Sequence, residues 1–328
     1  VFSAEELAAE AGRLARPSSV VEDCVGVPGV AEAAALYAAG ENAELRLTKT
    51  VDGKLTCAIA EAPSALAPGV GRAQGHLAVV GIGPGAPSWR TREVTDVLAR
   101  ADAFVGYSLY LDLVDALRQG RPRFDYPLGD ETERCRFALE HAAEGRTVAL
   151  VSSGDAGIYA MASLVAELLH QDDLSDGAKR VALTVCPGVS AAQAAAARAG
   201  APLGHDFAFV SLSDLLTPWA AIRRRLEAVA TADFVVALYN PRSRRRTAQL
   251  EEAAEIFRAA RPAETPVMIA ESLSRPAEAI HYTNLKACDP AAVHMLATVI
   301  IGASSTKSFG RGDGSTLVYT PRGYGVGT

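Results

Sequence analysis

The stretch "HLAVVGIGPGAPSWRT", residues 76–91, joins the pattern of a buried strand to a glycine-rich turn. The segment "GIGPGA", residues 81–86, satisfies the G-x-G-x-x-A fingerprint of dinucleotide sites. That fingerprint also requires a helix directly after the turn and an acidic residue at the end of the next strand. Here a proline follows Ala86, the helical pattern is delayed to about Arg92, and the next strand ends in "VGYS" without an acid. We therefore expect a stiff backbone that a flat ligand can approach closely, and not a pyrophosphate site.

The same alternation of apolar run, small-residue turn and helical pattern recurs along the chain. Residues 76–204 contain the runs "LAVVGIG", "AFVGYS", "TVALVSSG" and "VALTVCPG", each followed by a helical pattern. A second series, from "FAFVSLSD" to "ATVIIGAS", occupies residues 205–303, and residues 304–328 are typical of a hairpin plus a tail. Short apolar runs alternating with helices are typical of buried strands in an α/β fold. The sequence therefore predicts two consecutive α/β units.

The first 75 residues differ in composition from the rest. Residues 1–62 contain a helical pattern, "GVAEAAALYAAG", followed by two strand patterns, "ELRLTKT" and "LTCAIAEA". Residues 63–75 are rich in Ala, Pro and Gly and have no periodicity, which is typical of a linker. We expect a partial N-terminal α/β segment connected by a linker to the two main units.

Composition narrows the class of protein. The 328 residues carry a net charge of −6, which disfavours a nucleic-acid-binding face, and the chain has no apolar run of the roughly 18–20 residues that a membrane span needs. The five cysteines are scattered without C-x-x-C spacing, so neither a metal site nor a redox dithiol is expected. The opening "VFSAEELAAEAGRL" has no apolar core typical of a secretory leader, and we expect a cytoplasmic protein.

Three glycine-containing loops follow predicted strands. The second loop carries Ser153, Gly154 and Asp155, and the third carries Gly188 and Ser190. Because ligands gather at the carboxyl ends of strands in open α/β sheets, the three loops predict one shared pocket. The alternative is purely structural: the first loop is a tight connection, and the aspartate and the serine of the third loop cap helices.

Several of these motifs, in this order, resemble the tetrapyrrole methylases of cobalamin synthesis. The matching stretches are "VVGIGPGAPSWRT", "VSSGDAGIYAMASL", "CPGVSAAQAAAARAG", "ALYNPRSRRRT" and "TVIIGAS", and the resemblance covers about residues 76–303. Two longer stretches, "GAPLGHDFAFVSLSDLLTPW" and "YNPRSRRRTAQL", are similar to the branch that methylates C-17 of a precorrin. Residues 22–62 resemble the C-terminal part of a small accessory domain found beside or fused to such methylases.

Two departures from the family pattern are visible. The family usually reads G-D-P-G where this chain has Ala156 in the third position. Relatives more often carry a glycine-containing loop where this chain reads "AESLSRPAEAI", residues 270–280. The cofactor contacts of that second loop are therefore left open.

The resemblance implies a fold, a cofactor and a reaction. The two units would form a cleft that binds S-adenosylmethionine and a reduced tetrapyrrole, and the reaction would methylate precorrin-3B at C-17 and contract the ring to give precorrin-4. A homodimer, and contacts that pass intermediates to other enzymes of the pathway, are implied in the same way. The residues carried over to the cofactor are Gly83, Pro84, Gly85, Ser153, Gly154, Asp155, Ile158, Ser190, Ala191, Asn240 and Thr298.

Ring contraction requires proton transfers, so a general acid or base is expected. The candidates, in order of preference, are Asp206, His205, Asp214 and Tyr107, although the histidine could equally be a simple hydrogen-bond donor in its loop. The substrate carries carboxylates, which arginine binds with two parallel hydrogen bonds. The run "NPRSRRRT" therefore suggests Arg242 and Arg244 as substrate ligands, and a solvated helix face is the alternative.

Three other functions are compatible with parts of the sequence. A methylase acting at another ring carbon would have the same cofactor loops. A non-catalytic scaffold that binds a corrin intermediate would keep the pocket without the chemistry. A dinucleotide oxidoreductase is disfavoured by the missing acid and the delayed helix described above.

Overall fold

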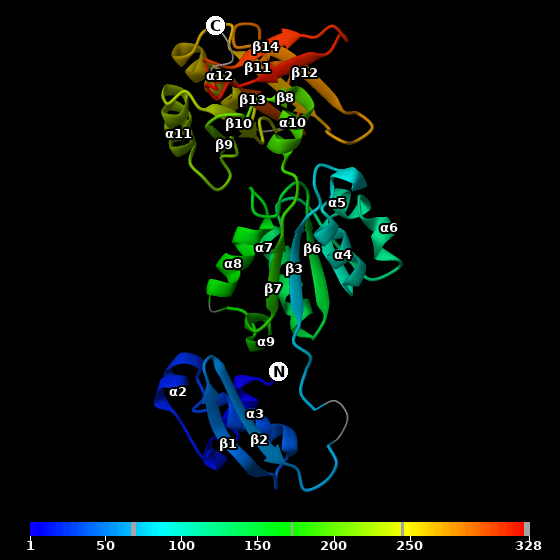
Figure 1. The fold of residues 1–328 in the computed structure, drawn as a ribbon, viewed down its shortest axis with the longest axis vertical. Helices are drawn as coiled ribbons and strands as arrows, with labels where there is room; N and C mark the ends of the chain where they lie inside the picture. The colour runs from blue at the N-terminus through cyan, green and yellow to red at the C-terminus, as the bar shows by residue number, and fades with distance from the viewer. Residues whose placement is uncertain (67–69, 172, 244–245, 325–328) are drawn as a thin grey trace.

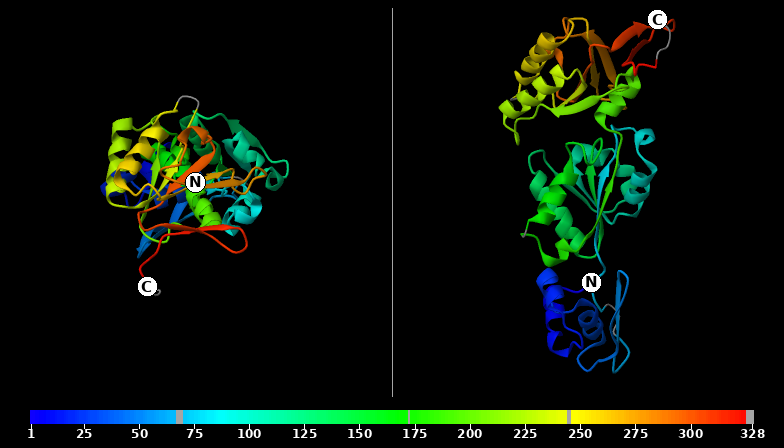
Figure 2. Two further views of the ribbon diagram at one scale, coloured as in Figure 1. Left: turned by 90° about the horizontal axis from the view of Figure 1, so that it is seen from above. Right: turned by 60° about the vertical axis from the view of Figure 1, so that its left-hand side comes forward.

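The expected strands and helices form three lobes along the long axis of the molecule (Figure 1). The computed structural model describes residues 1–66, 70–171, 173–243 and 246–324. Two further views show that the lobes follow one another in chain order, with the linker between the first and second (Figure 2). In the part of the chain so described, no helix is both long and apolar enough to cross a membrane.

The N-terminal lobe is a short α/β segment. A hairpin of two antiparallel strands packs against the third helix, and a small apolar cluster around Leu36 lies between them. The elements are α1 (Ala4–Ala8), η1 (Ala11–Arg13), α2 (Ser19–Val25), α3 (Val30–Ala39), β1 (Glu44–Asp52) and β2 (Leu55–Glu61).

The middle lobe is a five-stranded parallel sheet with the order β5-β4-β6-β3-β7. Its three inner strands are buried on both faces: in β3, Leu77 and Val79 pack towards α7 and α8, whereas Ala78 and Val80 pack towards α4. This period-two alternation explains the continuous apolar runs. The strands are β3 (His76–Gly81), β4 (Ala103–Tyr107), β5 (Arg123–Tyr126), β6 (Thr147–Ser152) and β7 (Ala182–Cys186).

The helices of the middle lobe flank this sheet. As expected from the sequence, the helix after the first glycine loop begins only at Arg92, where Thr91 caps it by accepting a hydrogen bond from the backbone N–H of Val94 at 3.2 Å. The helical elements are η2 (Pro87–Trp89), α4 (Arg92–Arg100), α5 (Ser108–Asp112), α6 (Asp115–Arg118), α7 (Glu131–Ala143), α8 (Met161–His170) and α9 (Asp176–Lys179).

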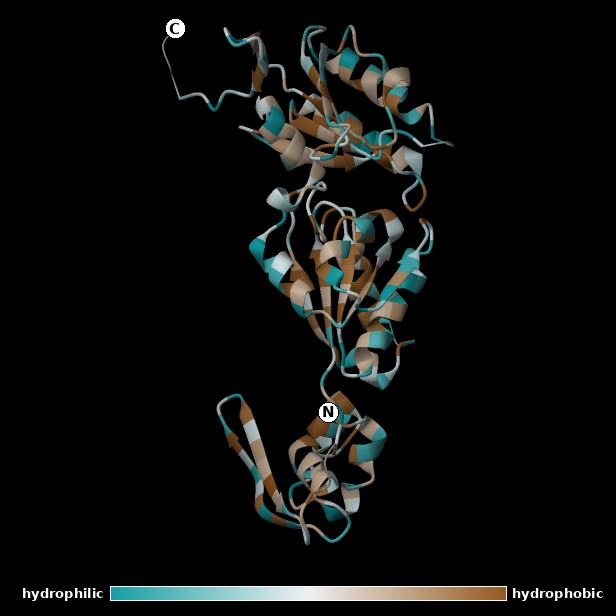
Figure 3. Cartoon of the chain, turned by 90° about the vertical axis from the view of Figure 1, so that its right-hand side faces the viewer, coloured by the Kyte–Doolittle hydropathy of each residue, from teal (hydrophilic) through white to brown (hydrophobic). Residues whose placement is uncertain are grey.

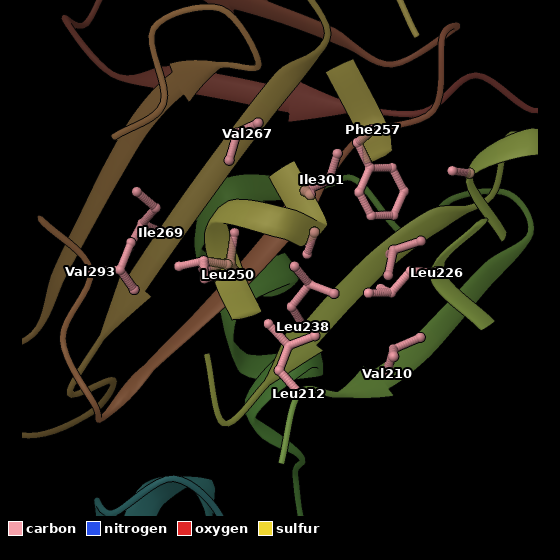
Figure 4. Close-up of a cluster of buried hydrophobic side chains, with 14 of the residues drawn as sticks. Val210, Leu212, Leu226, Leu238, Leu250, Phe257, Val267, Ile269, Val293 and Ile301 are labelled. Atoms are coloured by element: carbon pink, nitrogen blue, oxygen red, sulfur yellow. The ribbon is translucent and has the colours of Figure 1, made fainter. Parts of the chain in front are cut away.

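The third lobe contains a mixed sheet with the order β12-β11-β13-β10-β9, in which β9 and β10 are parallel and the other pairs antiparallel. Two helices cover one face of it, and Figure 4 shows Leu226 and Phe257 of these helices packed over Leu238 and Ile301 of the sheet. The elements are β9 (Phe207–Ser211), α11 (Trp219–Thr231), β10 (Val235–Tyr239), α12 (Gln249–Ala260), β11 (Pro266–Glu271), β12 (Ala279–Asn284), η3 (Pro290–Ala292) and β13 (Ala297–Ile301).

The division between the two main units differs from the expected boundary at residue 204. Helix α10 (Ala191–Ala199) follows the parallel sheet in sequence, but its alanines pack on the second sheet, against Val235, Met268 and Ile300. The units therefore separate just after β7. Residues 304–328 contribute the hairpin β14 (Lys307–Gly310) and β15 (Thr316–Tyr319), which pairs with β8 (Gly200–Ala201).

Hydropathy follows this architecture. The strands of both main sheets are predominantly hydrophobic, and polar residues lie on the outer helices (Figure 3). The carboxyl ends of β3, β4 and β6 point towards the third lobe (Figure 1), which brings their loops to the junction of the two units.

Candidate functional site

The glycine loops of the middle lobe meet backbone against backbone. Gly83 and Gly154 exchange two hydrogen bonds: the N–H of Gly83 donates to the oxygen of Gly154 at 3.0 Å, and the reverse bond measures 2.8 Å. A Cβ atom on Gly188 would lie 2.1 Å from the oxygen of Gly154 and 2.3 Å from that of Gly81. Glycine is therefore required by contact between loops, whatever ligand they bind.

Asp155 fastens two of these loops together. One carboxylate oxygen accepts the N–H of Gly157 at 2.8 Å, and the other accepts the N–H of Gly188 at 3.0 Å. Ser153 is held less tightly, with its hydroxyl 3.5 Å from the oxygen of Gly83. The structural role of Asp155 is thus to link the second glycine loop to the third through hydrogen bonds; we call this pair of bonds the Asp155 clasp.

The other residues expected at the cofactor from the middle lobe lie in the same loops. Ser190 is buried and caps α10, accepting the N–H of Gln193 at 3.2 Å and donating its own N–H to the Gln193 side chain at 3.0 Å. Ala191 is the first residue of that helix. Ile158 is half-buried in the turn between Asp155 and α8.

The third lobe brings the carboxyl ends of β9, β10 and β11 to this junction, together with the amino end of the antiparallel β13. The Tyr159 hydroxyl of the middle lobe donates to the oxygen of Phe209 in β9 at 2.8 Å. Within the third lobe, the N–H of Ala192 in α10 donates to the hydroxyl of Tyr239 at 3.1 Å. Asn240 follows β10 directly, and its amide donates to the Ser211 hydroxyl at 3.0 Å. The two units therefore touch where the predicted cofactor residues of both are found.

Thr298 lies at the same edge of the second sheet. It is opposite Ala270 at the end of β11, near the start of β13, and it is 7% exposed. The strand register thus places it close to the end of β10 and beside Asn240.

The loop after β11 reaches across to the first glycine loop. The guanidinium Nε of Arg275 donates to the oxygen of Pro84 at 2.9 Å, and the hydroxyl of Ser274 accepts the N–H of Ala86 at 2.8 Å. Gly85 lies directly against the Arg275 side chain, since a Cβ there would be 2.9 Å from Cγ. Sequence reasoning missed both residues, although the loop "AESLSRPAEAI" had been noted as a departure from the family pattern.

The four candidates for proton transfer separate into two groups. Tyr107 ends β4 with its ring 5.3 Å from that of Tyr110, and Asp214 lies in the loop after β9, where its carboxylate accepts the Gln249 amide at 2.9 Å. Both lie at the carboxyl edges of their sheets.

His205 and Asp206 lie elsewhere. They precede β9, so they occupy its amino end, opposite Ser211 and Asn240. Both are more than half exposed, with the imidazole Nδ1 3.2 Å from the carboxylate, and they line a surface hollow with Arg322. The structure does not bring the two preferred candidates to the loop cluster, because a residue before a parallel strand lies at the edge away from the ligand.

The described residues of the basic run after β10, Arg242, Ser243 and Arg246, lie outside any helix. Arg242 donates to the backbone oxygens of Pro290 and Ala291, at 3.3 and 2.7 Å, and so anchors η3. Arg244 lies outside the described residues. Arg246 is 7% exposed; its Nε donates to the oxygen of Asn240 at 3.1 Å and its Nη1 lies 3.7 Å from Asp214.

Tyrosine side chains without charge lie at the junction of the two units. The Tyr159 and Tyr239 rings lie 5.2 Å apart. Burial raises the pKa of both phenols, and it raises the pKa of Tyr110 as well. These hydroxyls therefore stay protonated at neutral pH and act as hydrogen-bond donors and acceptors without charge.

The fold and this junction define a class of protein: two α/β units with glycine-rich loops where they meet. The chain belongs to the tetrapyrrole (corrin/porphyrin) methylases, whose family model matches residues 76–289. Residues 1–60 match a second model, cobalamin synthesis G C-terminus.

Curated relatives support this membership. A probable cobalt-factor III C(17)-methyltransferase of Salmonella typhimurium is 44% identical over 248 residues, which cover 76% of this chain and 99% of the relative. A precorrin-3B C(17)-methyltransferase of a Sinorhizobium species is 44% identical over 250 residues, covering 76% and 97%. The chain spans less than half, 45%, of a Priestia megaterium cobalt-factor III methyltransferase to which it is 41% identical.

Among solved structures, the methyltransferase CobJ is similar with a TM-score of 0.70 and 38% sequence identity; the match covers 76% of this chain and all of that one. The predicted family and the two-unit α/β fold are confirmed, with the boundary moved as described above.

Proposed function

We propose that this chain methylates C-17 of a reduced tetrapyrrole, precorrin-3B, with S-adenosylmethionine as methyl donor, and that it contracts the ring to give precorrin-4. The observation that carries the proposal is the junction itself, where the first glycine loop of one unit is hydrogen-bonded to the loop after β11 of the other, and Tyr159 of the second loop to β9. The names of the relatives that match along nearly their whole length supply the ring position.

The residues at the junction fit the proposed cofactor. The Ser153 hydroxyl, which is held only by a 3.5 Å contact with the oxygen of Gly83, and the Asn240 amide offer hydrogen-bonding groups that suit ribose hydroxyls and an adenine ring. The cofactor supplies an electrophilic methyl group when bound. The contribution of the protein is to hold donor and acceptor in line and to exclude water, which can be worth about 7–11 kcal/mol.

We assign proton transfer during ring contraction to residues at the edges of the two sheets that meet at the junction. Of the four candidates, we retain Asp214 and Tyr107, because both follow strands whose carboxyl ends meet the junction. The carboxylate of Asp214 faces the buried Arg246 and is oriented by Gln249, so it is held in one position for a proton to be taken or returned.

The first experiment is a calorimetric titration of the protein with S-adenosylhomocysteine, and with NAD in a parallel cell. Binding of the adenosylhomocysteine without NAD supports the proposal, whereas binding of NAD alone contradicts it. Turnover is then measured with precorrin-3B and with its cobalt-containing counterpart, and the product is identified by mass and by the position of the new methyl group. A methyl group at another carbon would favour the rival methylase activity.

The assembly of the protein is part of the same proposal. We infer a homodimer from the family resemblance, and sedimentation equilibrium of the purified chain measures it directly. Contacts that hand the unstable tetrapyrrole to other enzymes of the pathway remain a prediction.

A further inference from the structure

Arg275 occupies a distinctive position at the junction. It follows β11 in the third lobe, yet its Nε atom donates to the oxygen of Pro84 in the middle lobe and its Cγ covers Gly85. The hydrogen bond fixes the plane of the guanidinium group against the first glycine loop. The charge is thus brought to the loop that the proposed function assigns to the cofactor.

The terminal nitrogens of this guanidinium are not used by the protein. Across the described residues, the side chain of Arg275 has one hydrogen bond, through Nε, and no ion pair. The nearby carboxylate of Glu278 is already engaged: it accepts Nε of Arg198 at 2.7 Å and the N–H of Ser274. A cation in contact with a binding loop is therefore left without a carboxylate partner.

The surroundings of the group favour an anion that arrives with a ligand. Burial raises the pKa of the partly buried Tyr110 phenol against the opposing influence of the Arg275 charge, so this nearby group is neutral. Arginine presents parallel N–H groups that match both oxygens of a carboxylate, and such charge-assisted pairs are stronger than neutral hydrogen bonds.

We propose that Arg275 is a ligand-binding residue that receives a carboxylate at the junction of the two units, through its two terminal nitrogens. The inference rests on the proposed function, which offers two sources of that group: the amino acid part of the cofactor and the acidic side chains of the tetrapyrrole. The hydrogen bond from Nε to the oxygen of Pro84 orients the guanidinium group, and its two terminal nitrogens bind the carboxylate.

The test uses the full chain and two adenosine compounds that differ in one part. S-adenosylhomocysteine has a carboxylate, and 5′-methylthioadenosine has none. Both are titrated into the wild-type protein, Arg275→Ala, Arg275→Lys and the matched control Ser274→Ala. The control removes the other hydrogen bond between the same two loops and keeps the charge.

If the cofactor is the source, Arg275→Ala weakens binding of S-adenosylhomocysteine about 10- to 100-fold and leaves that of methylthioadenosine within twofold. If the tetrapyrrole is the source, both affinities stay unchanged and the KM for the tetrapyrrole rises by the same factor. In either case the affinity or KM of Arg275→Lys lies between those of the wild-type protein and of Arg275→Ala. Lysine keeps the positive charge but lacks the two parallel N–H groups of the guanidinium. Each result supports the inference.

Two results would overturn it. The first is an Arg275→Ala protein with unchanged affinities and unchanged KM. The second is an equal loss for both adenosine compounds in Arg275→Ala and in Ser274→Ala, which would make the arginine a structural tie between the units. A wild-type protein that binds neither compound contradicts the proposed function itself, and the inference with it.

Discussion

In both units, loops that follow strands contain residues with positive φ, in the left-handed region of the backbone. The two units differ in which residue types adopt this conformation. In the middle lobe the positions are glycines, Gly83 with φ 76° and Gly154 with φ 68°. In the third lobe they are Asn240, Ser272 and Ser274, with φ of 51°, 49° and 59°. A residue with a Cβ adopts this conformation at a cost of about 1–2 kcal/mol, so these loops of the third lobe hold strain that the glycine positions of the middle lobe avoid.

The difference follows from what each loop touches. The glycine loops lie so close that no side chain fits between them, whereas two non-glycine positions direct side chains across the junction. Ser274 accepts a hydrogen bond from Ala86, and Tyr159, a non-glycine residue of the middle lobe with φ 51°, donates to Phe209. Glycines allow the loops within one unit to pack closely, whereas residues with a strained backbone, Ser274 and Tyr159, carry the side chains that connect one unit to the other.

The largest effect is expected from Gly188→Ala. The new Cβ would meet two backbone oxygens, Gly154 O and Gly81 O, neither of which can rotate away. We expect a loss of about 3 kcal/mol or more in the free energy of unfolding, measured by urea denaturation. The control is Gly312→Ala, where a Cβ meets nothing within 4 Å. Equal stability of the two variants would show that the glycine loops are not tightly packed.

The loop cluster also shows how far sequence can predict this molecule. The order of strands and helices, the start of α4 at Arg92 and the gathering of the glycine loops follow from local patterns and from the geometry of parallel sheets. The bond from Arg275 to Pro84 joins residues 191 positions apart, and no local pattern specifies it. His205 and Asp206 lie at the amino end of β9, away from the glycine loops, and their position before a predicted strand already indicates that edge of the sheet.

The second prediction concerns alkaline pH and separates the stability of the units. The two fully buried thiols belong to the middle lobe, and burial raises the pKa of Cys135 to about 12 and that of Cys186 to about 11. In the unfolded chain these thiols lose protons near pH 9, while in the folded state they keep them. The unfolded state is thus favoured as pH rises above 9, by about 1.4 kcal/mol per thiol at pH 10.

The measurement is urea denaturation between pH 8 and pH 10, followed by a probe in each lobe. The middle lobe should lose stability more steeply than the third lobe, where Cys288 is only partly buried. The variant Cys135→Ala with Cys186→Ala should reduce this pH dependence. A slope that is unchanged in the double variant would assign the effect to other groups.

The third prediction tests the clasp made by Asp155. Asn can still accept the N–H of Gly157, but an amide nitrogen placed at the second oxygen cannot accept the N–H of Gly188. Asp155→Asn should therefore lower the free energy of unfolding by about 1–2 kcal/mol and weaken binding of S-adenosylhomocysteine through the displaced loop. If binding weakens at unchanged stability, the carboxylate contacts the cofactor itself, as the family resemblance implies.

The smallest effect is expected where strain is removed without loss of a contact. Ser272 has φ 49°, and among the described residues its side chain has no hydrogen bond that a glycine would forfeit. Ser272→Gly should raise the free energy of unfolding by up to about 1 kcal/mol, because relief of the strained conformation exceeds the added entropy of the unfolded chain. Ser274→Gly provides the comparison: it relieves similar strain and loses the hydrogen bond to Ala86, so its stability should rise less or fall. If denaturant titrations give the same change in the free energy of unfolding for both variants, the hydrogen bond from Ala86 to the Ser274 side chain does not stabilise the contact between the units. In this loop, the third lobe would then not connect to the middle lobe through a side chain.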